Sequence, residues 1–427
     1  MLHLDISAAT AKLITSTAGI PEQEFTLLRT NMRRYIEDWL KERSRGQHAW
    51  SMDPYDRKAI ERVREAAVRA RGEGIQTILW IGIGGSGLGP TVLQEVFEGP
   101  ETPAFIVMDS LDPAVLASYL AMVNWKTTMV VVASKSGDTL EPMSIFFLCY
   151  RRLKEAMGRK AAERVIAVTD PEKGHLRAFC LQEGIPMLPI PPGVGGRYSI
   201  FTPIGLLPMA LLNADLDRFI RGAKEMDTLC QKTNIENNPA ALLAATQFLL
   251  ESKRGYRIRV IMPYSERLRS IARWNQQLIA ESLGKNETHN PIPSAAIGTQ
   301  DQHSLLQQWM AGPRAQWHLF IRDIEKPHLA VPRDIPEPFG WMAGKSFGEL
   351  FDACYEGTSR ALLSVKRPSA TISITRLDAY HLGQLFFLLL AEVVFLGKLY
   401  RIDPYGQPAV ETGKNITKEL LMKGKMM

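Results

Sequence analysis

Short apolar segments alternate with longer helical segments through much of this chain, and this alternation most constrains its fold. Apolar runs occupy residues 77–82, 104–109, 128–133 and 164–169. The segments between them have helical character, for example residues 140–157. Short apolar strands that alternate with helices indicate a parallel sheet covered on both faces. The sequence therefore predicts an α/β protein.

The same pattern restarts after a helical stretch at about 203–253. Strand-like segments follow at residues 257–262, 294–298, 317–321 and 371–375. At 427 residues the chain can bury a large core, and its length suggests two domains. We therefore expect two α/β units in tandem.

Composition narrows the class of partner. The chain is 45% hydrophobic and 22% charged, with a net charge of +6, which is ordinary for a soluble globular protein. Lysine and arginine form no block, so nucleic acid is not expected as a partner. The mild basicity fits an anionic small-molecule ligand.

Cysteine usage and hydropathy bear on location. The four cysteines are scattered, without a CxxC pair or metal-ligand spacing, so we expect reduced thiols, a cytoplasmic location and no metal site. The first residues do not resemble a signal peptide. The apolar run 385–397 is shorter than the roughly 20 residues that a bilayer span needs. It is predicted to be a buried core helix, and no membrane association is expected.

A glycine-rich loop follows the first predicted strand. Gly82, Gly84 and Gly87 formally match a dinucleotide-binding fingerprint, with Asp109 at the end of the next strand. Glycines let backbone N–H groups approach an anion closely. Ser86 could instead donate its hydroxyl to a ligand. A tight strand-to-helix turn, a sugar-binding loop and a nucleotide-dependent oxidoreductase all remain open at this point.

The loop after the third strand is more specific. Ser134, Ser136 and Thr139 supply three hydroxyls and Lys135 supplies a cation, just before a helix. These groups and the N–H groups of a helix start can surround a phosphate. Both loops follow strands of one sheet, and that edge holds the ligand in open α/β sheets. The sequence therefore predicts phosphate binding here.

A polar stripe marks the helix-like segment 273–285. Arg273, Gln277 and Glu281 are four residues apart and share one helix face. Glu281 lies about one turn before Gly284, a predicted C-terminal cap. The carboxylate could act as a positioned general base. A surface stripe with an ion pair is the alternative.

Three further segments carry candidate residues. Arg197 lies in a glycine-rich turn that could bring it against an anion, although lone loop arginines more often pair with a surface acid. His303 lies in the segment 298–304, which joins a predicted strand to a predicted helix. Its side chain could exchange protons near neutral pH, or have no role there. Gln407 and Lys414 lie near or on a predicted C-terminal helix, which alone is an ordinary amphipathic end.

Taken together and in this order, the segments from Ile81 to Lys414 resemble the glucose-6-phosphate isomerase family. The matching motifs are Gly-Gly-Ser-x-Leu-Gly-Pro, Ser-Lys-Ser, Gly-Gly-Arg-Tyr-Ser, Gln-x-x-x-Glu-Ser-x-Gly-Lys, Gly-Thr-x-x-Gln-His and Gln-x-x-Val-Glu-x-Gly-Lys. The resemblance implies two tandem sugar-isomerase (SIS) domains, each a parallel sheet flanked by helices. We expect an N-terminal helical segment, two SIS domains and a C-terminal helical tail at residues 1–73, 74–220, 221–400 and 401–427.

The resemblance also implies an activity: reversible isomerisation of glucose 6-phosphate and fructose 6-phosphate by a homodimer without metal or organic cofactor. Glu281 would be the base at carbon 2, and Arg197 would stabilise the enediolate. Lys414 and His303 would assist ring opening, with His303 reaching the site of the partner subunit. The implied substrate-binding residues are Gly85, Ser86, Ser134, Lys135, Ser136, Thr139, Gln277 and Gln407.

One departure and one alternative remain open. Asp138 lies in the phosphate loop, where the family often has no acid, so its side chain either points away or lowers phosphate affinity. A non-catalytic phosphosugar sensor would need the two loops but not Glu281, His303 and Lys414 together. The presence of all three favours an enzyme.

Overall fold

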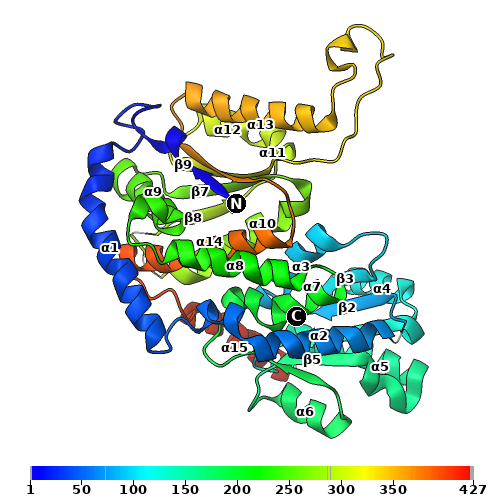
Figure 1. The fold of residues 1–427 in the computed structure, drawn as a ribbon. Coiled ribbons are helices and arrows are strands. Elements are labelled where there is room, and N and C mark those ends of the chain that lie inside the picture. Colours follow the sequence, from blue (N-terminus) through cyan, green and yellow to red (C-terminus); the bar gives the residue numbers. More distant parts are fainter. Residues whose placement is uncertain (1, 73, 286, 289, 424–427) are drawn as a thin grey trace.

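The computed structural model describes residues 2–72, 74–285, 287–288 and 290–423. In this part of the chain two five-stranded sheets lie one above the other with helices between them (Figure 1). The central helices include α8 (Leu216–Cys230) and α14 (Ala379–Tyr400), which pack against each other. The α/β architecture with helix-flanked parallel sheets confirms the predicted fold class.

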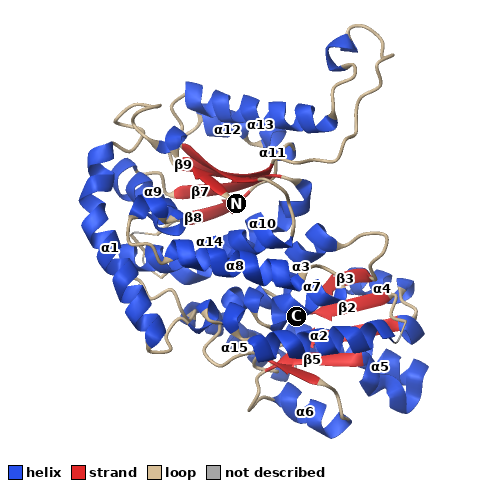
Figure 2. Ribbon diagram, in the orientation of Figure 1, coloured by secondary structure: helices blue, strands red, loops and turns tan. Residues whose placement is uncertain are grey.

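The first sheet is wholly parallel and has the strand order β3-β2-β4-β5-β6 (Figure 2 draws the strands in red). The bounds are β2 Thr77–Ile81, β3 Ala104–Met108, β4 Thr128–Ala133, β5 Val165–Thr169 and β6 Met187–Pro189. The first four coincide with the predicted apolar runs to within one residue at each end. The three residues of β6 are too few for a hydrophobic pattern to reveal them.

This strand order creates a switch point beside β2. The chain leaves β2 for β3 on one side and later returns to β4 on the other, and Ile81 pairs with Val132. The carboxyl ends of β2 and β4 therefore lie next to each other. In open α/β sheets the ligand crevice forms at such a point. The glycine loop and the 134–139 loop both begin there.

The second sheet has the order β1-β10-β9-β7-β8. Its strands are β1 His3–Asp5, β7 Ile258–Tyr264, β8 Ile292–Ala295, β9 Gln316–Asp323 and β10 Ser369–Ile374. Four are parallel, whereas β1 adds to the edge as an antiparallel partner of β10. The mostly helical N-terminal segment thus begins with an edge strand of the second sheet. The domain boundaries after residues 73, 220 and 400 stay a prediction.

The helices have caps that their sequences explain. Asn238 accepts an N–H bond at the start of α9 (Pro239–Arg254) and Pro239 occupies its first turn, while Gly255 ends it at φ +77°.

The remaining α-helices are α1 Glu22–Ser44, α2 Arg57–Gly72, α3 Gly85–Phe97, α4 Pro113–Met122, α5 Leu140–Met157, α6 His175–Glu183, α7 Pro203–Leu211, α10 Arg269–Leu283, α11 Gln300–Ser304, α12 Leu306–Ala311, α13 Phe347–Ser364 and α15 Pro408–Met422.

Helix α14 is the core helix that the apolar run predicted, although it is longer than the run. By length and composition alone it could cross a membrane, and 94% of its apolar window is buried inside the protein. The argument from length was therefore wrong, whereas the expectation of burial is confirmed. Glu392 of α14 receives two bonds from Arg259 of β7, at 2.5 and 3.0 Å, and both side chains are fully buried. This ion pair fixes the core helix to the second sheet.

A buried histidine in β9 makes stability depend on pH. His318 is 1% exposed and its ring contacts those of Trp309 and Phe320. Neither ring nitrogen has a hydrogen-bond partner among the described residues. Burial, with a smaller contribution from the charge of Arg367, lowers the pKa of His318 from 6.5 to about 3. The folded protein therefore holds this imidazole neutral.

We expect this histidine to cost stability in acid. Because the folded pKa is lowered, the unfolded chain binds more protons between pH 3 and 6.5, and stability falls as the pH drops through that range. The loss at pH 5 is about 2 kcal/mol. His318→Leu should show a smaller decrease in thermal unfolding temperature between pH 7.5 and 5 than the wild type. An equal decrease in both proteins would contradict the assignment, because all other titrating groups are shared.

Candidate active site

The glycine loop is packed against two other parts of the chain. A Cβ atom on Gly85 would lie 2.1 Å from the carbonyl carbon of Gly196, and one on Gly84 would lie 2.9 Å from Nε2 of Gln277. Gly84 also has φ +58°, a conformation that favours glycine. Ser86 follows in the first turn of α3 and is half-buried. The loop thus lies against the backbone of the Arg197 turn and against the Gln277 side chain of α10, and a larger residue at Gly85 would prevent the first contact.

The predicted phosphate loop lies at the N-terminus of α5. The hydroxyl of Ser134 is buried and accepts a backbone N–H at 3.1 Å, and the hydroxyls of Ser136 and Thr139 are 3.4 Å apart. Lys135 donates from Nζ to the carbonyl oxygen of Val194 at 2.8 Å. The loop therefore combines hydroxyls, an ammonium group and the positive end of a helix, and Lys135 links it to the turn before Arg197.

Asp138 has a partner outside this loop. Its carboxylate contacts Nδ1 of His175, the first residue of α6, and both side chains are largely exposed. The carboxylate is therefore directed towards α6. Of the two interpretations of this residue, its direction favours the one in which the acid points away from the phosphate.

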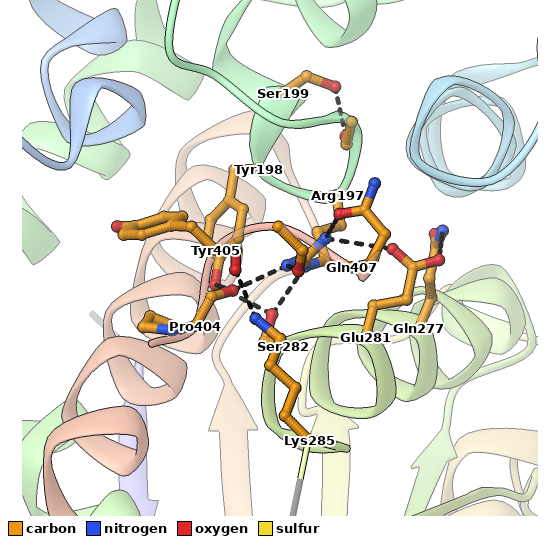
Figure 3. A network of polar contacts seen from close by, with 12 residues as sticks. Arg197, Tyr198, Ser199, Gln277, Glu281, Ser282, Lys285, Pro404, Tyr405 and Gln407 are labelled. Carbon is orange, nitrogen blue, oxygen red and sulfur yellow. Dashed lines mark hydrogen bonds and ion pairs between the residues drawn. The ribbon is translucent and has the colours of Figure 1, made fainter. Parts of the chain in front are cut away.

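Arg197 is the centre of the polar network in Figure 3. It lies in the short 3-10 helix η6 (Gly196–Phe201) and is only 4% exposed. Its five N–H groups donate to Ser282 Oγ at 2.8 Å, Glu281 Oε2 at 3.2 Å, Gln407 Oε1 at 2.8 Å, and the carbonyl oxygens of Pro404 at 2.8 Å and Gly406 at 3.0 Å. A guanidinium keeps its charge when buried, so it is a fixed cation beside the carboxylate.

Glu281 stands between an amide and this cation. Gln277 donates from Nε2 to Oε1 of Glu281 at 2.9 Å, so the two residues share the helix face that their spacing predicted. The side chain of Glu281 keeps 30% of its surface exposed, which leaves it open to a ligand. Arg273, the first member of the stripe, is exposed and makes no hydrogen bond or ion pair to Glu281. The cationic partner is Arg197 from a different element.

The structure brings together Arg197, Gln277, Glu281 and Gln407, with both first-sheet loops adjoining the Arg197 turn. His303 lies exposed in α11, beside α12 (Figure 1). Lys414 lies exposed in α15 and pairs with Glu411 at 2.8 Å. Within the described ranges, no hydrogen bond or ion pair connects either residue to the cluster.

Sequence reasoning missed several members of the network. The hydroxyl of Ser282 accepts from Arg197 and lies 3.0 Å from the hydroxyl of Tyr198. Lys285 and Tyr405 also join it. Ser282 and Lys285 lie inside a quoted motif, which was their only signal, whereas Tyr405 lies outside the quoted motifs. Among the described residues, no group of three or more histidine, cysteine, aspartate or glutamate side chains could hold a metal ion.

Two α/β sheets, a loop of hydroxyls and one lysine at a switch point, and a carboxylate beside a buried arginine fit a class of enzyme that works on a small phosphorylated substrate. A family model described as phosphoglucose isomerase matches residues 49–426. The chain therefore belongs to the phosphoglucose isomerase family.

Individual relatives agree with this assignment. The chain is 37% identical to a glucose-6-phosphate isomerase of Rubrobacter xylanophilus, over 85% of this chain and 87% of that protein. It is 34% identical to a probable glucose-6-phosphate isomerase of Haloarcula marismortui, over 98% and 94%. A crystal structure of a hypothetical protein from Thermus thermophilus matches with a TM-score of 0.87 and 29% identity, over 99% of this chain and all of that chain.

Proposed function

We propose that this protein interconverts glucose 6-phosphate and fructose 6-phosphate. The observation that carries the proposal, beyond the family, is the placement of Glu281. Its carboxylate has one oxygen on Gln277 and the other on Arg197, and it keeps part of its surface open. A carboxylate held in this way can take a proton from one carbon and return it to the next.

The phosphate end of the substrate fits the 134–139 loop. Ser134, Ser136 and Thr139 would donate hydroxyl bonds to the phosphate, and the N-terminus of α5 favours its charge. Lys135 would add a cation, after exchanging its bond to Val194 for the substrate. This remote group supplies binding energy that orients the reacting carbons.

Proton transfer between carbons 2 and 1 would pass through a cis-enediolate. Glu281 is the base, and Arg197 stabilises the oxyanion because its guanidinium is already fixed beside the carboxylate. All five N–H groups of Arg197 have protein partners, so the oxyanion would displace or share the bond to Gln407. Oε1 of Gln277 is buried without a partner among the described residues, which leaves an acceptor for a sugar hydroxyl. Gly85 and Ser86 would line the sugar.

Ring opening requires a proton carrier at the ring oxygen and the anomeric hydroxyl. We assign it to His303 and Lys414. His303 would come from the partner subunit of a homodimer, which agrees with its exposure and its lack of a bond to the cluster of its own chain. Lys414 would reach inward from α15, whose first turn follows Gln407. We place this homodimer in the cytoplasm.

The decisive experiment is a coupled assay of the purified protein with each sugar phosphate. We expect turnover in both directions. Binding of both sugar phosphates without turnover would instead support the phosphosugar sensor. NAD binding, or an NAD-dependent absorbance change without the coupling enzyme, would support the oxidoreductase that the glycine pattern left open.

A further inference from the structure

Four consecutive carbonyl groups of the loop 403–406 alternate between two cations. One cation is Arg197 and the other is Lys285, which follows the C-cap of α10 (Figure 3). In chain order the contacts are Lys285 with Asp403 at 2.6 Å, Arg197 with Pro404 at 2.8 Å, Lys285 with Tyr405, and Arg197 with Gly406 at 3.0 Å. The side chains of Arg197 and Lys285 therefore hold the backbone of this loop between them.

This loop determines where Arg197 points. It supplies two of the five acceptors of the guanidinium through its carbonyl groups, and Gln407, the next residue, supplies a third. The remaining bonds go to Ser282 and Glu281 on α10. A shift of the loop would therefore move three of the five acceptors together and rotate the guanidinium relative to Glu281.

The loop has a second, separate anchor. The hydroxyl of Tyr405 accepts from Nε1 of Trp50 at 2.9 Å and contacts Nδ1 of His48 at 2.5 Å. The ring of Tyr405 also lies 5.1 Å from that of Tyr198. Because these contacts hold the side chain, loss of Lys285 would leave the loop attached to the core. We therefore expect loss of Lys285 to turn the backbone carbonyls of the loop without unfolding the protein.

The charges of the two cations also interact. Burial and then the positive charge of Arg197 lower the pKa of Lys285, whereas Asp403 raises it. The two cations are thus close enough to repel. Carbonyl oxygens turned alternately towards each of them offset that repulsion, because each oxygen is the negative end of a dipole.

We propose that Lys285 is a positioning residue for Arg197. It holds the carbonyls of Asp403 and Tyr405, so that those of Pro404 and Gly406 and the amide of Gln407 orient the guanidinium towards the developing enediolate. The role rests on the proposed function. Among the described residues, no hydrogen bond or ion pair links Lys285 to the loop 134–139 that would bind the substrate phosphate, so we expect Lys285 to act on the transition state and not on substrate binding.

The test compares Lys285→Met and Lys285→Arg with the wild type in the full-length protein. We expect Lys285→Met to lower kcat by about 10-fold while KM for fructose 6-phosphate changes by less than about twofold. Lys285→Arg, which keeps the charge and the donors, should recover most of the loss. A five-carbon aldonate phosphate, whose carboxylate imitates the enediolate, should bind the methionine variant weaker by the same factor as kcat falls.

The control is Lys326→Met. Lys326 also donates to a backbone carbonyl, that of Asp323 at 2.6 Å, and it pairs with Asp352 at 3.0 Å, but it lies in the loop after β9 of the second sheet. Its kcat should stay at the wild-type value. If Lys285→Met does not fold, Lys285→Gln keeps an N–H donor without the charge and takes its place in the comparison.

The outcomes separate the two proposals. A wild type without turnover contradicts the proposed function and, with it, the role of Lys285. An active wild type with an unchanged kcat in Lys285→Met contradicts this inference alone. So does an arginine variant as slow as the methionine variant, or an equal loss in the Lys326 control.

Discussion

Glu281→Gln is expected to lower kcat for both sugar phosphates by about 10³-fold, within the range that one positioned acid–base group supplies. Glutamine keeps the size of the side chain and can still bond to Gln277, now 2.9 Å away. It has no basic oxygen that could accept the proton from carbon 2. The substrate should therefore still bind, with KM close to the wild-type value.

Two measurements distinguish loss of the base from loss of the site. Exchange of solvent hydrogen into carbon 2 should stop together with isomerisation, whereas ring opening, assigned to His303 and Lys414, should continue in the variant. Glu37→Gln is the control, because Glu37 also bonds to an arginine, Arg33 at 3.2 Å, but lies on the exposed surface. Turnover within threefold of the wild type in Glu281→Gln would contradict the assignment.

The sequence predicts sheets well where strands are long and continuously apolar. Each of the predicted strands from 77 to 169 is present, because a strand buried on both faces must be apolar throughout. The strands that sequence reasoning missed, β1 and β6, have three residues each. Whether such a short segment forms a strand depends on the free edge of a neighbouring strand, and the local sequence does not encode that edge. β1 joins a strand about 370 residues later, as the pairing of His3 with Ser373 shows.

The residues of the site also differ in how far local sequence predicts their position. The loops after β2 and β4 are predictable, because parallel strands bring their carboxyl ends to one edge. The pairing of Gln277 with Glu281 is predictable from their spacing on one helix. Arg197 is not, since it bonds to residues 84 and 210 positions away. Only the family resemblance pointed to Arg197 as a member of the site, and Arg273, the first member of the stripe, had no assigned role.

The backbone contact between Gly85 and Gly196 leads to the second large expected effect. A Cβ on Gly85 would lie 2.1 Å from the carbonyl carbon of Gly196 and 2.5 Å from the backbone nitrogen of Arg197. Cβ atoms essentially never approach other heavy atoms closer than 3.0 Å, so Gly85→Ala must push the two loops apart. Displacement of a catalytic group by about 1 Å costs about 10²-fold in rate. We expect kcat to fall by that factor, because Arg197 moves away from Glu281.

Gly89 and Gly99 serve as controls for Gly85. None of the three has a positive φ, so alanine at each position differs only in the space available for its Cβ atom. A Cβ on Gly89 would meet only the end of the Ile200 side chain, at 2.9 Å, and one on Gly99 would meet nothing within 4 Å. Gly89→Ala should lose less than about threefold in kcat, because a flexible side chain can move aside and alanine favours the helix. Gly99→Ala should match the wild type. An active Gly85→Ala variant would show that the two loops separate without moving Arg197, and that the guanidinium is held in place by α10 and the 403–407 loop instead.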